Sequence, residues 1–324
     1  LSRLVLDYEA SRQIDEDSER LYHGFPNAPY DESLFEQHNV KRGLRNADGS
    51  GVVAGLTRIS DVHGYNRIDG RVVPDEGHLS LRGYSIDDLV NHAQAEDRFG
   101  YEEVAYLLLT GSLPNTEELE GFCERLRAFR HLSGDYIHEF PLTTPSKSIM
   151  NTLARAVLLL YRFDAEPDEI SPEHEIDVAM SMIARLPRIA ALAHMARVAQ
   201  REGRAPQIPQ PSPDLSTAES VLQVLRGGDD FTHDEAMLLD VMMMLHAEHG
   251  GGNNSTFTTH VVTSSGTDTY STMAAALCSL KGPRHGGANI KVVQMFKDLK
   301  RKVQHWFFST DLTFYIKGGR VTKT

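Results

Sequence analysis

Apolar residues recur at helical spacing along most of the chain after Tyr84, whereas the preceding segment is polar, glycine-rich and irregular. Apolar positions three and four residues apart predict amphipathic helices. The fold class that this pattern predicts is mainly α. We expect helices near the N-terminus over residues 1–22, from Ile86, over 101–109, from about 116, over 148–161, over 173–200, after Ser216, after Thr232 and over 270–280.

Several of these helices carry start signals of their own. Ser216 with Glu219, and Thr232 with Glu235, match the capping-box pattern, in which the first side chain and the fourth satisfy each other's backbone N–H groups. Pro187 interrupts the 173–200 pattern and predicts a kink there, because proline lacks the N–H that an interior helical position donates.

A small β element is expected between about residues 50 and 80. Asp-Gly pairs at 48–49 and 69–70 are typical of tight turns, and short β-rich runs lie beside them at 52–59 and 71–73. These runs are too short to define the fold.

The helix after Thr232 is apolar around almost its whole circumference, which predicts that it is buried, with its methionines filling gaps in the core. The alanine-rich helix over 270–280 is also expected to be buried. Histidines follow both helices, so the sequence predicts two histidine clusters held in place by core packing.

Composition limits the class of function. The chain has 324 residues, of which 40% are hydrophobic and 24% charged, and its net charge is −12. This acidic balance argues against a nucleic-acid surface, and no apolar run is long enough to span a membrane. Cys123 and Cys278 are expected to be buried free thiols in a reducing compartment. We expect a cytoplasmic protein.

The first histidine cluster, residues 246–255, reads HAEHGGGNNS. His246 and His249 share a helical face, but their spacing lacks one residue of the H-x-x-E-H metal pattern and no third ligand is evident. A structural hydrogen bond fits His246 better than His249. His249 opens onto the glycine run at 250–252, whose N–H groups can face an anion. With Asn253 and Ser255, the run indicates an anion or carbonyl site.

The second cluster follows the 270–280 helix, which ends in the stop signal Lys281, Gly282 and Pro283. His285 follows after Arg284, and Gly286 and Gly287 remove side-chain bulk beside it. This pattern indicates that another group approaches His285 closely.

The runs LHAEHGGGNNSTFTTH and GPRHGGAN resemble the citrate synthase family, including its methylcitrate relatives. The upstream segments KRGLRNADGSGVVAGLTRISDVHGY, RGYSIDDL and YEEVAYLLLTGSLPN are similar to that family's N-terminal region, and the resemblance covers about residues 40–297. It implies an almost all-helical fold with a large and a small domain, which close over the substrates, and a homodimer.

The resemblance also implies roles for particular residues. His285 would hydrogen-bond the acetyl-CoA thioester oxygen and stabilise the enol, with Ser255 orienting it. His249 and Asn253, with Gly251 and Gly252, would form the oxaloacetate-binding wall. The small-molecule partners implied are oxaloacetate and an acyl-CoA, and condensation would give citrate and CoA. Coenzyme A thioester is a substrate, so neither a cofactor nor a metal is expected.

The resemblance implies domain boundaries, but the continuous similarity to the family ends at about residue 297. Residues 1–285 would form the large domain, 286–305 the start of the small domain, and 306–324 fragments from the C-terminal part of the large domain, with 316–320 resembling the family's last helix and tail. A second catalytic histidine and the catalytic aspartate are not matched, and the neighbours of Asp311 do not fit that aspartate. The sequence therefore either joins pieces of a longer protein or represents a truncated, inactive one.

Three alternatives stay open. The acyl donor could be propionyl-CoA instead of acetyl-CoA. The protein could be a catalytically incomplete relative with a binding or regulatory role. A metallohydrolase that uses His246 and His249 is the third alternative, and it predicts bound zinc.

Overall fold

The computed structural model describes residues 32–41, 43–46, 50–140, 146–210, 212, 214–302, 314–317 and 320–323. The chain divides into two units, Leu1–Val52 and Val53–Thr324. The helix expected over 1–22 and the turn expected at 48–49 lie outside the described residues. The boundary expected near residue 285 stays a prediction.

The first unit contains one short helix, α3 (Glu32–Gln37), among its described residues. Beyond it, Arg45 and Gly51 form an isolated antiparallel bridge. Asn46 reinforces the bridge, because its N–H donates to the Ser50 carbonyl at 2.8 Å and its side-chain amide donates to Ser50 Oγ at 3.0 Å.

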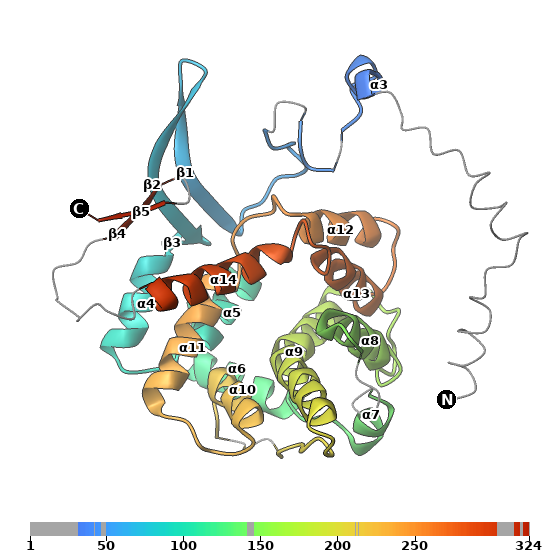
Figure 1. The fold of residues 1–324 in the computed structure, drawn as a ribbon. Coiled ribbons are helices and arrows are strands. Elements are labelled where there is room, and N and C mark those ends of the chain that lie inside the picture. The colour runs from blue at the N-terminus through green and yellow to red at the C-terminus, as the bar shows by residue number, and fades with distance from the viewer. Residues whose placement is uncertain are drawn as a thin grey trace, which may run out of the picture. The chain divides into compact units, whose positions relative to one another are not determined.

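The second unit is mainly helical, as the sequence predicted (Figure 1). Its helices are α4 (Ile86–Ala95), α5 (Tyr101–Thr110), α6 (Thr116–Phe129), α7 (Gly134–Glu139), α8 (Ile149–Tyr161), α9 (Pro172–Arg201), α10 (Thr217–Arg226), α11 (His233–His246), α12 (Asn254–Thr263), α13 (Thr269–Leu280) and α14 (Gly287–Lys302). Both predicted capping boxes are present, at the starts of α10 and α11. Pro187 lies inside α9, which continues through it. Helices α7, α12 and α14 were not predicted.

A long hairpin precedes the helices. Strands β1 (Ser60–Ile68) and β2 (Arg71–Leu81) pair antiparallel, and β3 (Tyr84–Ser85) adds to β2. The predicted turn at 69–70 is confirmed, with Asp69 at φ 52° and Gly70 at φ 75°. Both values lie in the left-handed region that the tightest hairpin turns require.

The strand expected over 52–59 is wrong, because β1 begins only at Ser60. Most side chains in the 52–59 segment are left uncovered by the described residues: Val53 is 89% exposed and Leu56 is 99% exposed. Glycines at 51 and 55 also weaken a strand there. The chain pairs instead where Ser60 lies opposite Leu81, which is fully buried.

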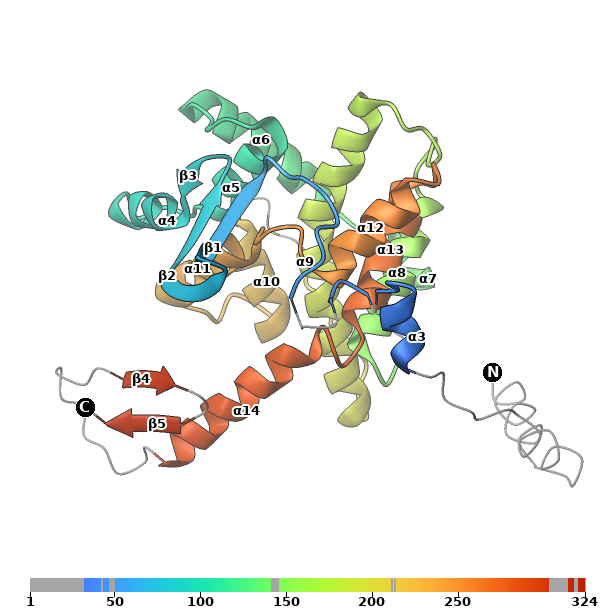
Figure 2. The ribbon, with the colours of Figure 1, turned by 90° about the horizontal axis from the view of Figure 1, so that it is seen from above.

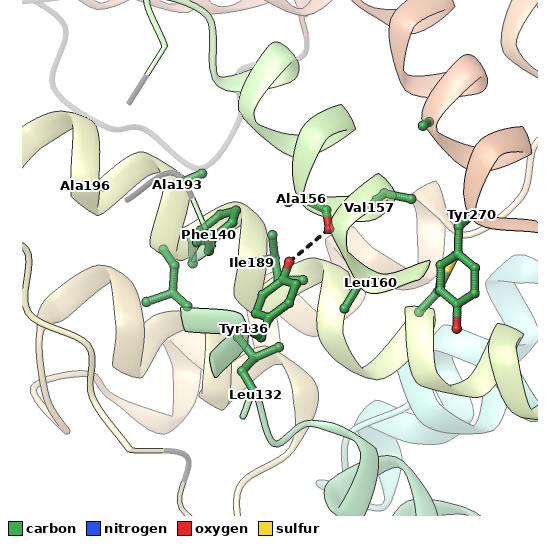
Figure 3. Close-up of a cluster of buried hydrophobic side chains, with 14 of the residues drawn as sticks. Leu132, Tyr136, Phe140, Ala156, Val157, Leu160, Ile189, Ala193, Ala196 and Tyr270 are labelled. Carbon is green, nitrogen blue, oxygen red and sulfur yellow. Dashed lines mark hydrogen bonds between the residues drawn. The ribbon is translucent and has the colours of Figure 1, made fainter. Parts of the chain in front are cut away.

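The largest hydrophobic cluster joins α7, α8, α9, α10 and α13. Figure 3 shows the Tyr136 ring inside it, beside Leu132, Phe140 and Ile189. The Tyr136 hydroxyl donates to the Ala156 carbonyl at 3.0 Å, which satisfies the polar end of a buried side chain. Figures 1 and 2 both show α8 and α13 beside each other, next to α9.

A second cluster connects the hairpin to the helices. Its buried members are Leu81, Ile86, Leu89, Val104, Leu107 and Met244. They come from β2, α4, α5 and α11, so the base of the hairpin and the C-terminal turn of α11 are held by the same packing. The loop that follows α11 therefore starts from a fixed point.

The burial predicted for α11 is wrong. Only Ala236, Asp240 and Met244 are buried, and they form a single stripe at spacings of four residues. On the other side of the helix, Leu238 is 65% exposed and Met242 is 49% exposed. The described residues cover only one face of this helix.

The prediction of two buried thiols holds only in part. Cys123 is partly buried, and burial raises the pKa of its thiol to about 11, whereas Cys278 is exposed. In α13 the buried positions end at Ala276, so Cys278 lies beyond the packed part of the helix.

At the C-terminal end, β4 (Phe314–Lys317) and β5 (Arg320–Lys323) form a two-stranded hairpin. The helix and tail that the resemblance implied for 316–320 are therefore not found. The β-branched and aromatic residues of 314–316 and 321–322, separated by Gly-Gly, favour a hairpin over a helix.

Asp240 joins α11 to the start of α5. Its carboxylate accepts hydrogen bonds from the N–H groups of Gly100 at 2.7 Å and Tyr101 at 3.2 Å. A side chain at position 100 would lie 2.7 Å from Met244 Sδ, so glycine lets the two helices approach. Burial raises the pKa of the Asp240 carboxyl to about 6, although the two N–H groups lower it.

Asp240→Asn should change how stability depends on pH. Between about pH 4 and 6 the folded protein keeps a proton on Asp240 that the unfolded chain has lost, so the free energy of unfolding falls as pH rises through this window. The shift corresponds to about 3 kcal/mol. Denaturant unfolding at several pH values should show that Asp240→Asn loses this decrease. Asp234→Asn, an exposed position on the same helix, should keep it. An unchanged slope in Asp240→Asn would contradict the assignment.

Candidate active site

The first histidine cluster forms the loop between α11 and α12, which we call the glycine loop (residues 247–253). It begins three residues after Met244, which is fully buried. It ends at Asn253, the N-cap of α12. Both ends are therefore fixed by local structure, as the sequence suggested for the α11 end.

Glu248 fixes the middle of the glycine loop. Its Oε1 accepts hydrogen bonds from the N–H of Gly250 at 2.6 Å and from the Ser60 hydroxyl at 2.9 Å. Gly250 adopts φ 93°, and a Cβ there would lie 3.3 Å from Val62 Cγ2. Left-handed backbone and close approach both favour glycine. The glycine loop is thus tied to the first residues of β1.

The sequence did not predict this contact, because Glu248 stands out there only as the acidic residue of the histidine pair's metal pattern. Ser60 lies 188 residues earlier in the chain, so no local pattern indicates that the two side chains meet. The contact from Glu248 to the N–H two residues on is a local signal, because short side-chain-to-backbone bonds of this kind are typical of turns.

His249 lies on the open side of the glycine loop. Its side chain is exposed, and it makes no hydrogen bond or ion pair with the residues that the structure describes. A Cβ at Gly252 would meet no atom within 4 Å, and one at Gly251 would meet only Thr256 Cγ2 at 3.8 Å. The imidazole and the neighbouring backbone are free to contact a ligand.

Asn253 has a structural role that the sequence did not reveal. Its Oδ1 accepts from the Thr256 N–H at 3.0 Å, and its Nδ2 donates to Thr256 Oγ1 at 3.0 Å. These bonds cap α12 and orient the side chain. One amide hydrogen is left over, and binding of oxaloacetate by Asn253 stays a prediction.

The structure brings Ser255 and His285 together across 30 residues of sequence. Ser255 Oγ lies 2.9 Å from His285 Nε2 and 3.0 Å from the Ala276 carbonyl oxygen. The serine comes from the first turn of α12, the carbonyl from α13 and the histidine from the turn after α13. This is the contact that the family resemblance implied for Ser255.

The Ser255 contact determines which ring nitrogen of His285 stays available. A serine hydroxyl has one hydrogen, and a carbonyl can only accept. When the Ser255 hydroxyl donates to Ala276, the ring donates to it through Nε2–H, and a neutral imidazole keeps its lone pair on Nδ1. When the hydroxyl instead donates to Nε2, the neutral ring is the other tautomer, which carries its hydrogen on Nδ1. In either arrangement Nδ1 is the nitrogen that faces away from the serine.

Gly286 explains how His285 is held. The His285 N–H donates to the Gly282 carbonyl at 3.0 Å, and the Gly286 N–H donates to the Leu280 carbonyl at 3.1 Å. A Cβ at position 286 would lie only 2.3 Å from Leu280 O. The group that approaches this glycine closely is therefore the backbone of α13. Around Gly287 the nearest contact is an ordinary 4.0 Å to Pro283.

The two clusters are joined through the start of α12. Ser255 lies two residues after the glycine loop and holds His285, so the loop's C-terminal end is adjacent to the second cluster. That the imidazoles of His249 and His285 face one cavity stays a prediction.

The metal interpretation gains no support. His246 Nδ1 lies 2.7 Å from the Met242 carbonyl, a hydrogen bond within its own helix, and its side chain is exposed. Within the described parts of the chain, no group of three or more histidine, cysteine or acidic side chains is arranged to hold a metal ion. Nor does any helix in those parts have the length and apolar character needed to cross a membrane.

Comparison with known proteins gives a consistent result. Residues 46–317 match the family model for the citrate synthase C-terminal domain. The chain is 32% identical over 267 residues to 2-methylcitrate synthase 1 of Corynebacterium glutamicum, covering 80% of this chain and 62% of that protein. It is 36% identical over 255 residues to the citrate synthase of Acidithiobacillus ferridurans, covering 77% and 60% respectively.

Solved structures agree. The citrate synthase of Pyrobaculum aerophilum superimposes with a TM-score of 0.64 at 28% identity, covering 80% of this chain and 62% of that one. The Thermoplasma acidophilum enzyme, in a ternary complex with carboxymethyl coenzyme A and oxaloacetate, gives 0.62 at 27% identity, covering 78% and 61%. The chain spans about 60% of the length of these relatives. On this evidence from motif, fold and sequence, the chain belongs to the citrate synthase family.

Proposed function

We propose that the protein is an acyltransferase that condenses acetyl-CoA with oxaloacetate, through an enol intermediate, to give citrate and CoA. The observation that carries this proposal is the 2.9 Å contact between Ser255 and His285 in a member of the citrate synthase family. A histidine held through Nε2 presents Nδ1 in a fixed direction, which suits it for one defined hydrogen bond to a substrate oxygen.

In the proposed reaction, His285 donates from Nδ1 to the thioester oxygen. The oxygen gains negative charge as the methyl group passes a proton to the catalytic aspartate that the family resemblance implies, which no residue of this sequence matches. A donor placed at the oxygen stabilises the enol more than the substrate. With the Ser255 hydroxyl donating to Nε2, the neutral imidazole is the tautomer that carries its hydrogen on Nδ1, so His285 donates from Nδ1 without carrying a charge. The enol carbon then attacks the ketone carbon of oxaloacetate, and hydrolysis of the citryl thioester releases CoA.

The glycine loop is the proposed oxaloacetate wall. His249, Asn253, Gly251 and Gly252 offer an imidazole, an amide and backbone N–H groups around an open surface. Donors of this kind complement a dicarboxylate with a keto oxygen. The Thermoplasma relative was solved with oxaloacetate and a coenzyme A analogue, which supports the same substrate classes for this chain. The acyl-CoA is a substrate, and the proposal requires no metal or cofactor.

A second candidate is 2-methylcitrate synthesis from propionyl-CoA. It is favoured by the similarity to 2-methylcitrate synthases 1 and 2 of Corynebacterium glutamicum, at 32% and 33% identity. The relatives named as citrate synthases are similar to the same degree, at 33% to 36%. A role in the tricarboxylic acid cycle goes with the first candidate. A cytoplasmic location stays a prediction from composition.

A homodimer is also proposed. Helix α12 supports it, because Phe257 and Val261 lie four residues apart on one face and are 39% and 53% exposed. Apolar side chains at this spacing form a stripe that a matching helix face would cover.

Release of CoA tests the proposed activity directly. With oxaloacetate present, a thiol reagent should detect CoA from acetyl-CoA, from propionyl-CoA or from both, and the ratio of kcat/KM values identifies the donor. His285→Ala should lower kcat about 100- to 1000-fold, because an oxyanion donor is lost, while the protein stays folded by circular dichroism.

Two results would oppose this assignment. Activity of His285→Ala within a few-fold of wild type would remove the role of His285. No CoA release from either donor by the wild-type protein would favour a non-catalytic relative with a binding or regulatory function.

His249→Ala should weaken the binding of oxaloacetate but not that of the acyl-CoA. Loss of one hydrogen bond to a charged ligand corresponds to about a tenfold rise in the KM for oxaloacetate, with little change in the KM for the acyl-CoA. Steady-state kinetics with each substrate varied in turn measures both constants. An equal loss for the two substrates would contradict the wall assignment.

Phe257→Glu combined with Val261→Glu should weaken the proposed dimer. Light scattering of the wild-type protein should give twice the 36.1 kDa chain mass. The double variant should shift towards the single chain, because a buried unpaired charge is costly. Asn254→Glu, at an exposed position in the same helix, is the matched control and should not shift. A monomeric wild-type protein would rule the dimer out.

A further inference from the structure

Among the described residues, the Glu248 carboxylate is the one side chain that bonds the glycine loop both to itself and to a distant strand. One oxygen, Oε1, accepts from the Gly250 N–H at 2.6 Å and from the Ser60 hydroxyl at 2.9 Å. The two donors come from distant parts of the sequence: Gly250 directly follows His249, and Ser60 begins β1. The carboxylate therefore restrains the backbone on both sides of His249.

The strand that receives this bond is itself fixed. Ser60 pairs with Leu81, which is fully buried in the same cluster as Met244 of α11. The N–H of Arg82 donates to the Ile59 carbonyl at 2.7 Å, and the Arg82 guanidinium donates to the Leu108 carbonyl of α5 at 2.7 Å. The base of β1 is thus anchored to β2 and α5, and Glu248 connects the glycine loop to this anchored point.

His249 itself has no such restraint. Its side chain is exposed and makes no bond to the described residues, so the restraint on it is that of the backbone, which sets the direction of the Cα–Cβ bond from which the ring extends. Gly250, the residue after it, adopts φ 93°, and glycine populates positive φ about as readily as negative φ. Without the Glu248 bonds, a loop of three consecutive glycines would sample many backbone conformations, and ordering them again would weaken ligand binding.

We propose that Glu248 is a positioning residue, which holds the glycine loop against Ser60 so that His249 and the adjacent N–H groups are already arranged for the keto acid. The proposal rests on the proposed function insofar as the ligand is oxaloacetate. Glu248 touches neither substrate. It acts through His249 and Gly250, by lowering the conformational freedom that binding would otherwise remove.

We call the two hydrogen bonds that Glu248 accepts, from Gly250 and from Ser60, the clamp. Two measurements on the full chain distinguish loss of the clamp from loss of ligand binding. Hydrogen exchange of the free protein should show the Gly250 amide protected in wild type and exchanging at least tenfold faster in Glu248→Ala, because its acceptor is gone. Titration calorimetry with oxaloacetate alone should show the Kd rising about tenfold in Glu248→Ala. Glu248→Gln keeps an acceptor oxygen and should recover most of both properties.

Ser60→Ala tests the distant half of the clamp. It should raise the oxaloacetate Kd about threefold. The double variant Ser60→Ala with Glu248→Ala should bind oxaloacetate no more weakly than Glu248→Ala alone, because both substitutions remove the same Ser60–Glu248 hydrogen bond. Asp61→Ala is the matched control: its exposed side chain on the next residue of β1 makes no bond to the described residues, and its Kd should match wild type.

The outcomes separate clearly. An unchanged oxaloacetate Kd in Glu248→Ala, or an equal loss of affinity for oxaloacetate and for the acyl-CoA, would overturn the positioning role. No binding of oxaloacetate by wild type, with Gly250 protected, would reject both the proposed keto acid and its positioning by Glu248 while leaving the loop restraint itself observed. An unprotected Gly250 amide in wild type would overturn the clamp whatever the ligand.

Discussion

The hydrogen bond between Ser255 and His285 is the interaction on which the functional interpretation depends. It fixes a histidine that lies in a turn, where a free side chain would adopt several rotamers. It also occupies Nε2, so that Nδ1 is the nitrogen left for the proposed substrate contact. Both residues depend on packing elsewhere. Ser255 is held by the capped start of α12, and His285 by the close approach of Gly286 to the end of α13. The site therefore depends on how the start of α12, the end of α13 and the turn that carries His285 meet.

The parts of the fold that sequence predicted are those whose causes are local. The capping boxes at Ser216 and Thr232, and the tight turn at 69–70, involve residues within three positions of each other, so the pattern contains the whole interaction. The contact of Ser255 with His285 spans 30 residues and could be inferred only from the family resemblance.

Burial and long-range contacts could not be predicted in the same way. Composition made α11 look fully buried, yet burial depends on which neighbours cover each face, and only the Ala236–Asp240–Met244 stripe is covered by described residues. Helix α12 was missed because its threonines and valines favour strands, and the Asn253 cap outweighs that tendency. Glu248 was missed because its partner, Ser60, is 188 residues away.

The position of the site follows from where packing ends. The glycine loop and Ser255 come from the packed side, where Met244 and Leu81 are fully buried. Helix α14 starts two residues after His285 and leaves Ile290, Val293 and Phe296 more than half exposed; in Figure 2 it extends away from the other helices. An amphipathic helix gains little stability without a surface to cover its apolar side. The proposed catalytic histidine thus lies between the packed helices that hold it and a helix whose apolar face the described residues leave uncovered. That residues 286–305 begin a second, closing domain stays a prediction, and such a domain would supply the surface that α14 lacks among the described residues.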